Sequence, residues 1–176
     1  MRIKLKNRLP GNDSKYSSLS YLNYQNSTNL HFHGLHVDPK EIRPGVYGDY
    51  MVDSPDAGVK PGEDRQHEIH LPSDHANGIY WYHPHLHGST TTQVLGGMFG
   101  AILISTPRND FDLPGGLRER VIFVHRLNLT DKGRSDNLYE YEDDNNSGFM
   151  LNGAYQPTIV MRPGEIQNWH FLNSDV

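Results

Sequence analysis

Apolar and polar residues alternate along several short segments of the chain, and turn-forming residues separate these segments. A period of two is that of a β-strand, in which successive side chains face opposite sides. Almost no segment has the wider spacing of an amphipathic helix. The strand-like segments are residues 1–5, 30–37, 66–71, 78–85, 99–105, 121–129, 158–161 and 166–172. Many short strands separated by turns predict an all-β protein built as a sandwich or barrel.

The stretch between residues 105 and 120 is dense in proline, glycine and charge, and it follows a strongly apolar segment. Such a composition is typical of a connection between folded units. We therefore expect a first domain over residues 1–107, a linker over 108–120 and a second domain over 121–176. A β-sandwich usually takes about 100 residues, so we expect the second domain to be incomplete.

Composition removes several classes of function. The 176-residue chain has a formal net charge of −5, so it offers no basic footprint for nucleic acid. No apolar run reaches the roughly 18 residues that a membrane-spanning helix needs. The chain contains no cysteine, which excludes disulfides, thiolate nucleophiles and thiolate metal ligands. Any metal must therefore be held by nitrogen and oxygen atoms.

Two stretches are rich in histidine: NLHFHGLH at residues 29–36 and WYHPHLHG at residues 81–88. In a strand, His31 and His33 share one face, and His83 and His85 do the same. Side chains two positions apart have Cα atoms roughly 6–7 Å apart, close enough to chelate one ion or to serve two neighbouring ions. Neutral imidazole suits copper, zinc, iron and nickel, and copper(II) has the highest affinity of these. The two pairs therefore predict a histidine metal site.

The remaining histidines are less regular. His36 and His87 share the two stretches, and we expect them to support the ligands or to face solvent. Five others are scattered, and for these a solvated or hydrogen-bonded imidazole is the expectation: His67, His70, His75, His125 and His170.

The two stretches resemble the first two copper-binding segments of the multicopper oxidases, the laccase-like blue copper enzymes. The similarity extends through VKPGEDRQHEIHLPSDHANGIYWYHPHLHGSTTTQVLGGMFGAILIST and through MLNGAYQPTIVMRPGEIQNWHFLNSD. The resemblance implies a cupredoxin-like Greek-key β-sandwich over residues 1–107, lacking one or more N-terminal strands, and the beginning of a second cupredoxin domain over 121–176.

The resemblance also implies roles for individual residues. His31 would bind the type 2 copper, His33 and His83 one copper of the type 3 pair, and His85 the other. These metals form the trinuclear cluster that reduces dioxygen to water while a reducing small molecule or metal ion is oxidised. Family members place an acidic residue near the cluster to handle protons. Asp49 is the candidate here, with Asp53 and Asp38 as rivals.

The chain also departs from the family pattern. Without cysteine it cannot build the type 1 copper that receives electrons, and it supplies only half of the histidines of the cluster. We therefore expect an N-terminal portion of an oxidase that is inactive alone, and that associates with the missing C-terminal half or with itself. Exposed apolar strand edges at residues 121–124 and 166–172 would favour such association. The resemblance further implies a secreted, periplasmic or cell-envelope location.

Two alternatives remain open at this point. One is a histidine-based copper or zinc module without catalysis. The other is a cupin-type mononuclear metalloenzyme, because His31, His33, Asp38 and Gly45 approach the first cupin motif. The cupin interpretation leaves the second histidine stretch unexplained, and aspartate stands where that motif has glutamate.

Overall fold

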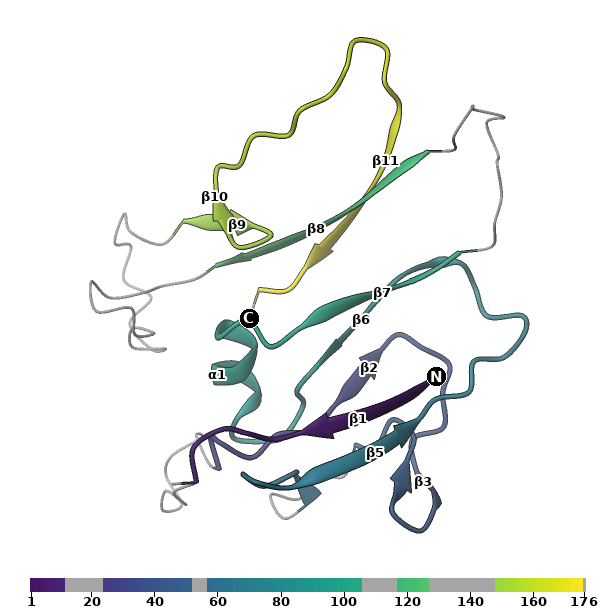
Figure 1. Ribbon diagram of the computed structural model, residues 1–176, viewed down its shortest axis with the longest axis vertical. Helices are drawn as coiled ribbons and strands as arrows, with labels where there is room; N and C mark the ends of the chain where they lie inside the picture. Colours follow the sequence, from purple (N-terminus) through teal and green to yellow (C-terminus); the bar gives the residue numbers. More distant parts are fainter. Residues whose placement is uncertain (12–23, 52–56, 106–116, 127–147, 176) are drawn as a thin grey trace. The chain divides into compact units, whose positions relative to one another are not determined.

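The computed structural model describes residues 1–11, 24–51, 57–105, 117–126 and 148–175. The chain divides into two compact units: unit 1 comprises Met1–Ala76 and Tyr80–Ile102, and unit 2 comprises Asn77–Ile79 and Leu103–Val176. Strands make up nearly all the regular structure of the described residues (Figure 1), which confirms the all-β prediction. Most of the expected linker falls outside the described ranges, and a strand already begins at Arg118.

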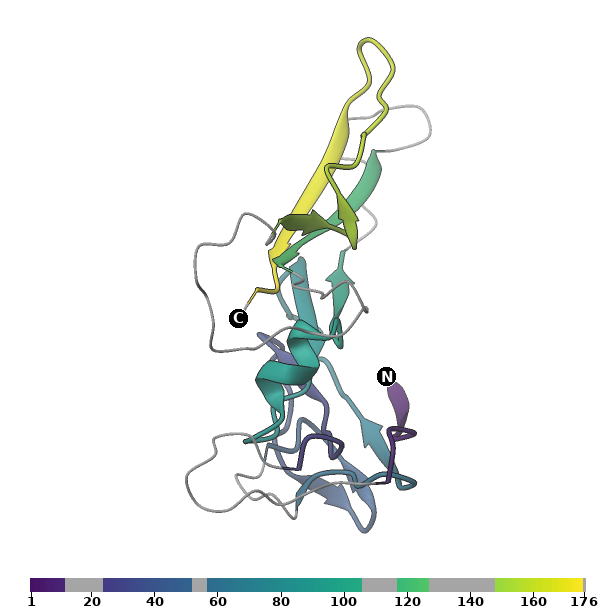
Figure 2. The ribbon, with the colours of Figure 1, turned by 90° about the vertical axis from the view of Figure 1, so that its left-hand side faces the viewer.

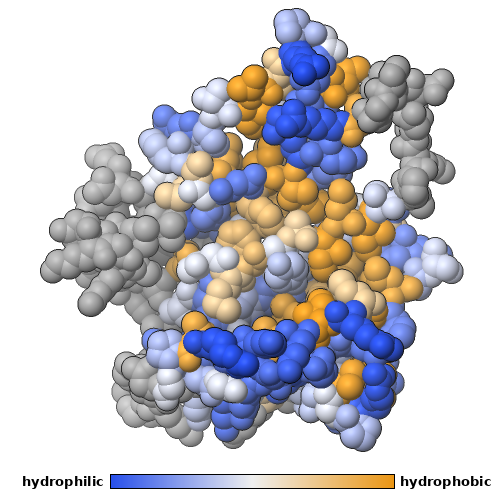
Figure 3. Space-filling view, viewed as in Figure 1, coloured by the Kyte–Doolittle hydropathy of each residue, from blue (hydrophilic) through white to orange (hydrophobic). Residues whose placement is uncertain are grey.

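The first sheet of unit 1 has the order β1-β5-β4-β3. Its strands are β1 (Arg2–Lys6), β3 (Glu41–Arg43), β4 (Val46–Tyr47) and β5 (Asp64–Glu68). β1 pairs antiparallel with β5, and β4 pairs parallel with β5. The alternating sequence of β1 places its basic residues on the exposed side. Figure 3 shows the resulting band of hydrophilic surface over β1 and β5.

A second sheet carries the histidines, lies mainly in unit 1 and has the order β2-β6-β7. Its strands are β2 (His31–His33), β6 (Gly78–His83) and β7 (Gly100–Ile104). β2 runs antiparallel to β6, and His31 lies directly opposite His83. The side chain between the two histidines of β2 points the other way, and Phe32 is accordingly 1% exposed. Phe32 belongs to a core that also contains Val59, Ile69 and Leu86.

One short helix, α1 (Thr90–Leu95), follows the second histidine stretch. The sequence did not predict it, because six residues are too few to display an amphipathic repeat. A buried side chain holds the helix: the amide group of Gln93 donates to the carbonyls of Gln25 at 2.9 Å and Ser27 at 2.7 Å. The amide oxygen of Gln93 accepts from the hydroxyl of Thr28 at 2.8 Å. These bonds attach α1 to the segment that leads into β2.

Unit 2 contains a sheet of order β10-β9-β8-β11. Its strands are β8 (Arg118–Arg126), β9 (Phe149–Leu151), β10 (Ala154–Tyr155) and β11 (Gln167–Asn173). β8 and β11 are parallel and lie side by side in both ribbon views (Figures 1 and 2). β8 pairs with β11 on one side; on the other side β9 pairs with it from Val124 onward, and Asn152 bonds Val121 and Phe123, so residues 121–124 are not the free edge that the sequence suggested.

The predicted strand at residues 158–161 is wrong. Its run of β-branched residues has strand propensity, but the segment pairs with no strand, and Val160 is 74% exposed. Among the described residues, no helix is long and apolar enough to cross a membrane.

Candidate metal centre

The pairing of β2 with β6 gathers three imidazoles on one face of the sheet. Ring centroids are 5.2 Å apart for His31 and His83, 5.5 Å for His31 and His33, and 5.6 Å for His33 and His83. One ring nitrogen from each of these three residues lies within 4.8 Å of the others, a separation at which they could hold a metal ion. The strand geometry predicted two pairs, and the structure brings them into one cluster.

His85 lies just beyond the end of β6 and extends the cluster on one side. Its ring centroid is 5.2 Å from that of His31 and 5.8 Å from that of His83. The backbone N–H of His85 donates to the side-chain oxygen of Asn29 at 2.6 Å, and Asn29 is 4% exposed. Pro84 has no N–H and cannot donate a backbone hydrogen bond. The bond from His85 to Asn29 therefore anchors the backbone directly after Pro84. The sequence analysis missed Asn29, whose only signal is its position just before the first histidine pair.

The tautomer of His83 follows from its hydrogen bond. Its Nδ1 lies 2.8 Å from the carbonyl oxygen of Pro84, which can only accept, so the proton sits on Nδ1 and Nε2 keeps its lone pair. That Nε2 lies 3.4 Å from Nδ1 of His33. The indole of Trp81 stacks on the His83 ring with centroids 4.0 Å apart.

Burial keeps these imidazoles in the form that binds metals. Burial, together with the neighbouring His31, His33 and His85, lowers the pKa of His83 to about 4 despite the bond to the Pro84 carbonyl. Burial and the adjacent histidines also lower the pKa of His33. Both rings are therefore neutral near pH 7, as ligation requires.

Asp49 orients His31. The Nδ1 atom of His31 lies 3.0 Å and 2.9 Å from the two carboxylate oxygens of Asp49, which places the proton on Nδ1 and directs the Nε2 lone pair into the cluster. The backbone N–H of Phe32 donates to the same carboxylate at 2.9 Å. Asp49 itself is 8% exposed.

The two rival acids differ from Asp49 in their surroundings. The side chain of Asp38 is 45% exposed and contacts Lys40 at 3.4 Å. Asp53 lies outside the described residues. Of the two candidates that the structure describes, Asp49 is the one whose carboxylate bonds a histidine of the cluster.

The histidines outside the four have other surroundings. The His87 ring lies 6.2 Å from that of His85, at the margin of the cluster. The backbone N–H of His36 donates to Nε2 of His75 at 3.1 Å, and His70 lies 2.8 Å from the carboxylate of Glu68. The contacts of His70 and His75 fit the expectation of hydrogen-bonded imidazoles.

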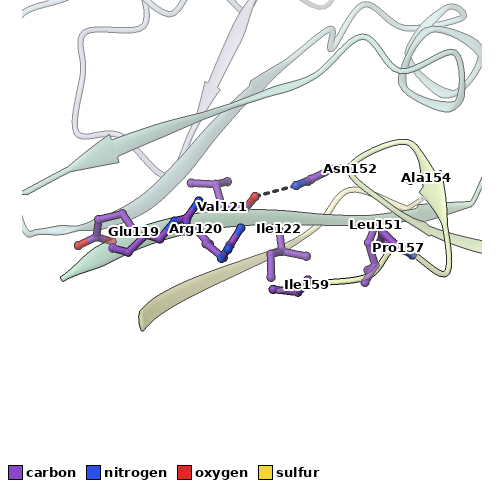
Figure 4. A pocket seen from close by; sticks show the side chains of 10 residues that line it. Glu119, Arg120, Val121, Ile122, Leu151, Asn152, Ala154, Pro157 and Ile159 are labelled. Carbon is purple, nitrogen blue, oxygen red and sulfur yellow. Dashed lines mark hydrogen bonds between the residues drawn. The ribbon is translucent and has the colours of Figure 1, made fainter. Parts of the chain in front are cut away.

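Unit 2 contains a hollow of about 350 Å³ between β8 and the segment at residues 151–159 (Figure 4). Asn152 spans one side of it by donating its side-chain N–H to the carbonyl of Val121 at 3.0 Å. No histidine lines this hollow. None of the four clustered histidines therefore contributes to its lining.

Comparisons with known proteins agree with the geometry. The family profile described as multicopper oxidase matches residues 18–109, more than half of the chain. The chain therefore belongs to the multicopper oxidase family. This membership confirms the resemblance of the two histidine stretches and leaves no place for the cupin interpretation. Multicopper oxidases are oxidoreductases, and copper is the metal that the family implies.

Individual relatives support the same assignment. A multicopper oxidase from Staphylococcus aureus is 26% identical over 155 residues, which cover 82% of this chain and 30% of the relative. The multicopper oxidase of Campylobacter jejuni, described as a metallo-oxidase, superposes with a TM-score of 0.60 at 26% identity, over 89% of this chain and 28% of that one. The McoA multicopper oxidase of Aquifex aeolicus superposes with a TM-score of 0.62 at 24% identity, over 85% of this chain and 31% of that one.

These superpositions confirm the cupredoxin-like fold. The chain spans less than a third of the length of each of these three relatives.

Proposed function

We propose that the four clustered histidines bind copper and form half of the trinuclear cluster of a laccase-like oxidase. In this proposal His31 binds the type 2 copper, and His85 binds one copper of the type 3 pair. His33 and His83 share the other type 3 copper. The observation that carries the proposal is the convergence of bare ring nitrogens from two paired strands, in a chain of the multicopper oxidase family.

The donor set fits such a metal. Two imidazoles on one ion, each at about 2.0–2.1 Å in a roughly tetrahedral arrangement, have nitrogens about 3.3 Å apart. The Nδ1 of His33 and the Nε2 of His83 are 3.4 Å apart, long for a hydrogen bond but suited to a shared ion. Copper(II) heads the affinity order of the divalent metals for nitrogen donors.

The residues around the ligands hold them for the reaction. When bound, copper in this family supplies the electrons that convert dioxygen to water. Asp49 fixes the tautomer of His31, and Asn29 anchors the backbone of His85. Because Asp49 is a buried carboxylate bonded to a ligand, it is also our candidate for the group that handles protons during this reduction.

We further propose that this chain is the N-terminal part of the catalytic unit. Dioxygen and a reducing small molecule or metal ion are its substrates. The remaining cluster ligands and the type 1 copper, which needs a cysteine, come from a C-terminal half or a further copy. The alternative is a copper or zinc module without catalysis, which would use the same four imidazoles.

Isothermal titration of the chain with Cu²⁺ tests the proposal. Changing each of the four histidines separately to alanine should raise the dissociation constant of copper more than tenfold, because each removes a direct ligand. His70→Ala is the matched control, since its side chain is 72% exposed and lies outside the cluster. Unchanged copper affinity in all four variants would refute the site, and a preference for Zn²⁺ would favour the non-catalytic module.

A further inference from the structure

His67 is a buried histidine that the metal site does not use directly. It lies in β5, is 2% exposed, and packs edge-on against Phe32 with ring centroids 6.1 Å apart. Its Nδ1 lies 2.9 Å from the carbonyl oxygen of Gly48, which can only accept. Burial lowers the pKa of His67, so the ring is neutral and its single N–H is committed to Gly48.

The other ring nitrogen identifies what this histidine contributes. Nε2 of His67 is buried and has no hydrogen-bond partner among the residues that the structure describes, which is unfavourable for a polar atom. A phenylalanine would fill nearly the same space beside Phe32 without that unfavourable term. The one interaction that phenylalanine could not supply is the hydrogen bond to Gly48.

Other backbone contacts also hold Gly48 in place. Its N–H donates to the carbonyl of Lys40 at 2.9 Å, and a Cβ at this position would come within 2.0 Å of the carbonyl oxygen of Asp38. The next residue, Asp49, donates its N–H to that same oxygen at 2.8 Å. Both polar groups of the peptide between Gly48 and Asp49 are therefore hydrogen-bonded: the C=O accepts from His67, and the N–H donates to Asp38.

We propose that His67 is a positioning residue that holds the carboxylate of Asp49 against His31 by binding the Gly48 carbonyl. The contacts form a continuous series. His67 donates a hydrogen bond to the carbonyl of Gly48, a peptide bond joins Gly48 to Asp49, and the carboxylate of Asp49 accepts from the Nδ1–H of His31. The inference rests on the proposed function only in treating His31 as a copper ligand. The orientation of His31 in the metal-free protein does not depend on copper.

Two substitutions at His67 separate the hydrogen bond from packing. His67→Phe keeps a ring beside Phe32 but removes the donor, whereas His67→Asn keeps a donor close to the position of Nδ1. Long-range ¹H–¹⁵N NMR of the metal-free 176-residue chain at pH 7.5 reports which nitrogen of His31 carries the proton. We expect the Nδ1–H form in the native chain and in His67→Asn, and a mixture of tautomers in His67→Phe.

Copper titration gives a second measurement. Loss of a hydrogen-bond partner that acts directly on a ligand costs 10- to 100-fold in metal affinity, and His67 acts one residue further away. We therefore expect the dissociation constant of copper to be roughly fivefold larger in His67→Phe and unchanged in His67→Asn. The control is His70→Asn, because His70 is exposed and lies close to the end of the same strand. This substitution should leave the His31 tautomer and the copper affinity unchanged.

The outcomes distinguish this inference from the proposed function. A native His31 tautomer in His67→Phe would overturn the inference, and so would His67→Asn behaving like His67→Phe, including both failing to fold. If the native chain binds no copper while the tautomers change as expected, the proposed function fails and the positioning role stands.

Discussion

Replacing Asp49 with asparagine changes the cluster at one point and nearly preserves volume. The carboxylate now presents two acceptors to Nδ1 of His31, at 3.0 and 2.9 Å, and one of them also accepts from the backbone N–H of Phe32. A carboxamide keeps one acceptor and places an NH₂ group at the other position. That group opposes the Nδ1–H of His31 and favours the tautomer whose proton occupies Nε2, the nitrogen that would bind copper in the proposed site.

The magnitude follows from the kind of bond that is lost. Hydrogen bonds to a charged partner contribute about 1.5–3 kcal/mol, and losing the partner of a metal-bound histidine weakens metal binding by roughly 10- to 100-fold. Asparagine retains the acceptor for Phe32, so we expect Asp49→Asn to lie at the lower limit, about tenfold or about 1.4 kcal/mol. Asp49→Ala, which also leaves the buried N–H of Phe32 unpaired, should be at least as severe.

Copper affinity measured by isothermal titration at pH 7 checks this expectation, with circular dichroism to confirm folding. Asp38→Asn is the matched control, because it makes the same change of charge on a half-exposed side chain eleven positions earlier in the chain. An Asp49→Asn variant that binds copper within twofold of the native chain would refute the reasoning. Equal loss in Asp38→Asn would assign the effect to net charge alone.

The remaining predictions concern stability, His85 and association. In the metal-free chain, His83 has a pKa of about 4 when folded and about 6.5 when unfolded, so the unfolded state binds more protons between these values. The free energy of unfolding should accordingly fall by about 3 kcal/mol as the pH drops from 7 to 4, and urea titrations should show a flatter dependence in His83→Phe. Asn29→Ala should weaken copper binding about tenfold, because the backbone of His85 loses its anchor, whereas an unchanged titration would assign Asn29 a purely local role. Unit 2 exposes Val160 by 74% and Phe171 by 58%, and hydrophobic residues are visible among its strands in Figure 3, so light scattering should show association; a monodisperse monomer at high concentration would contradict this. Copper-loaded chain should show neither an intense blue absorption band nor oxygen uptake with a phenol, because no cysteine is present; turnover by the chain alone would contradict the proposed division of the active site.

Alternation of polar and apolar residues located the strands that carry the histidines. The segments predicted at residues 30–37 and 78–85 contain β2 and β6, because each has one face of imidazole and one face of core residues. Shorter elements escaped prediction. β3 and β4 have three and two residues, and unlike β2 they do not lie within a longer alternating segment, because Pro44 and Gly45 separate them.

The hydrogen-bond partners of the clustered histidines were harder to predict, because they depend on tertiary contacts. The sequence favoured Asp49 but left Asp53 and Asp38 as rivals, and burial against His31 is what sets Asp49 apart from Asp38. Asn29 reaches His85 across 56 positions of sequence. Neither relationship has a local pattern, since the first joins β2 to the segment after β4 and the second joins the residues that flank the paired strands β2 and β6.

The register that sets His31 opposite His83 joins positions 52 residues apart in the chain. The unfolded polypeptide holds these imidazoles far apart on average, so closing the intervening loop must precede any shared coordination. A metal that binds only when the two strands are paired stabilises the folded state relative to the unfolded state. At a free copper concentration of about 100 times the dissociation constant, mass action alone adds about 2.7 kcal/mol to the stability of the paired form. A chelator withdraws that contribution, so the melting temperature of the chain should report the copper supply of its surroundings.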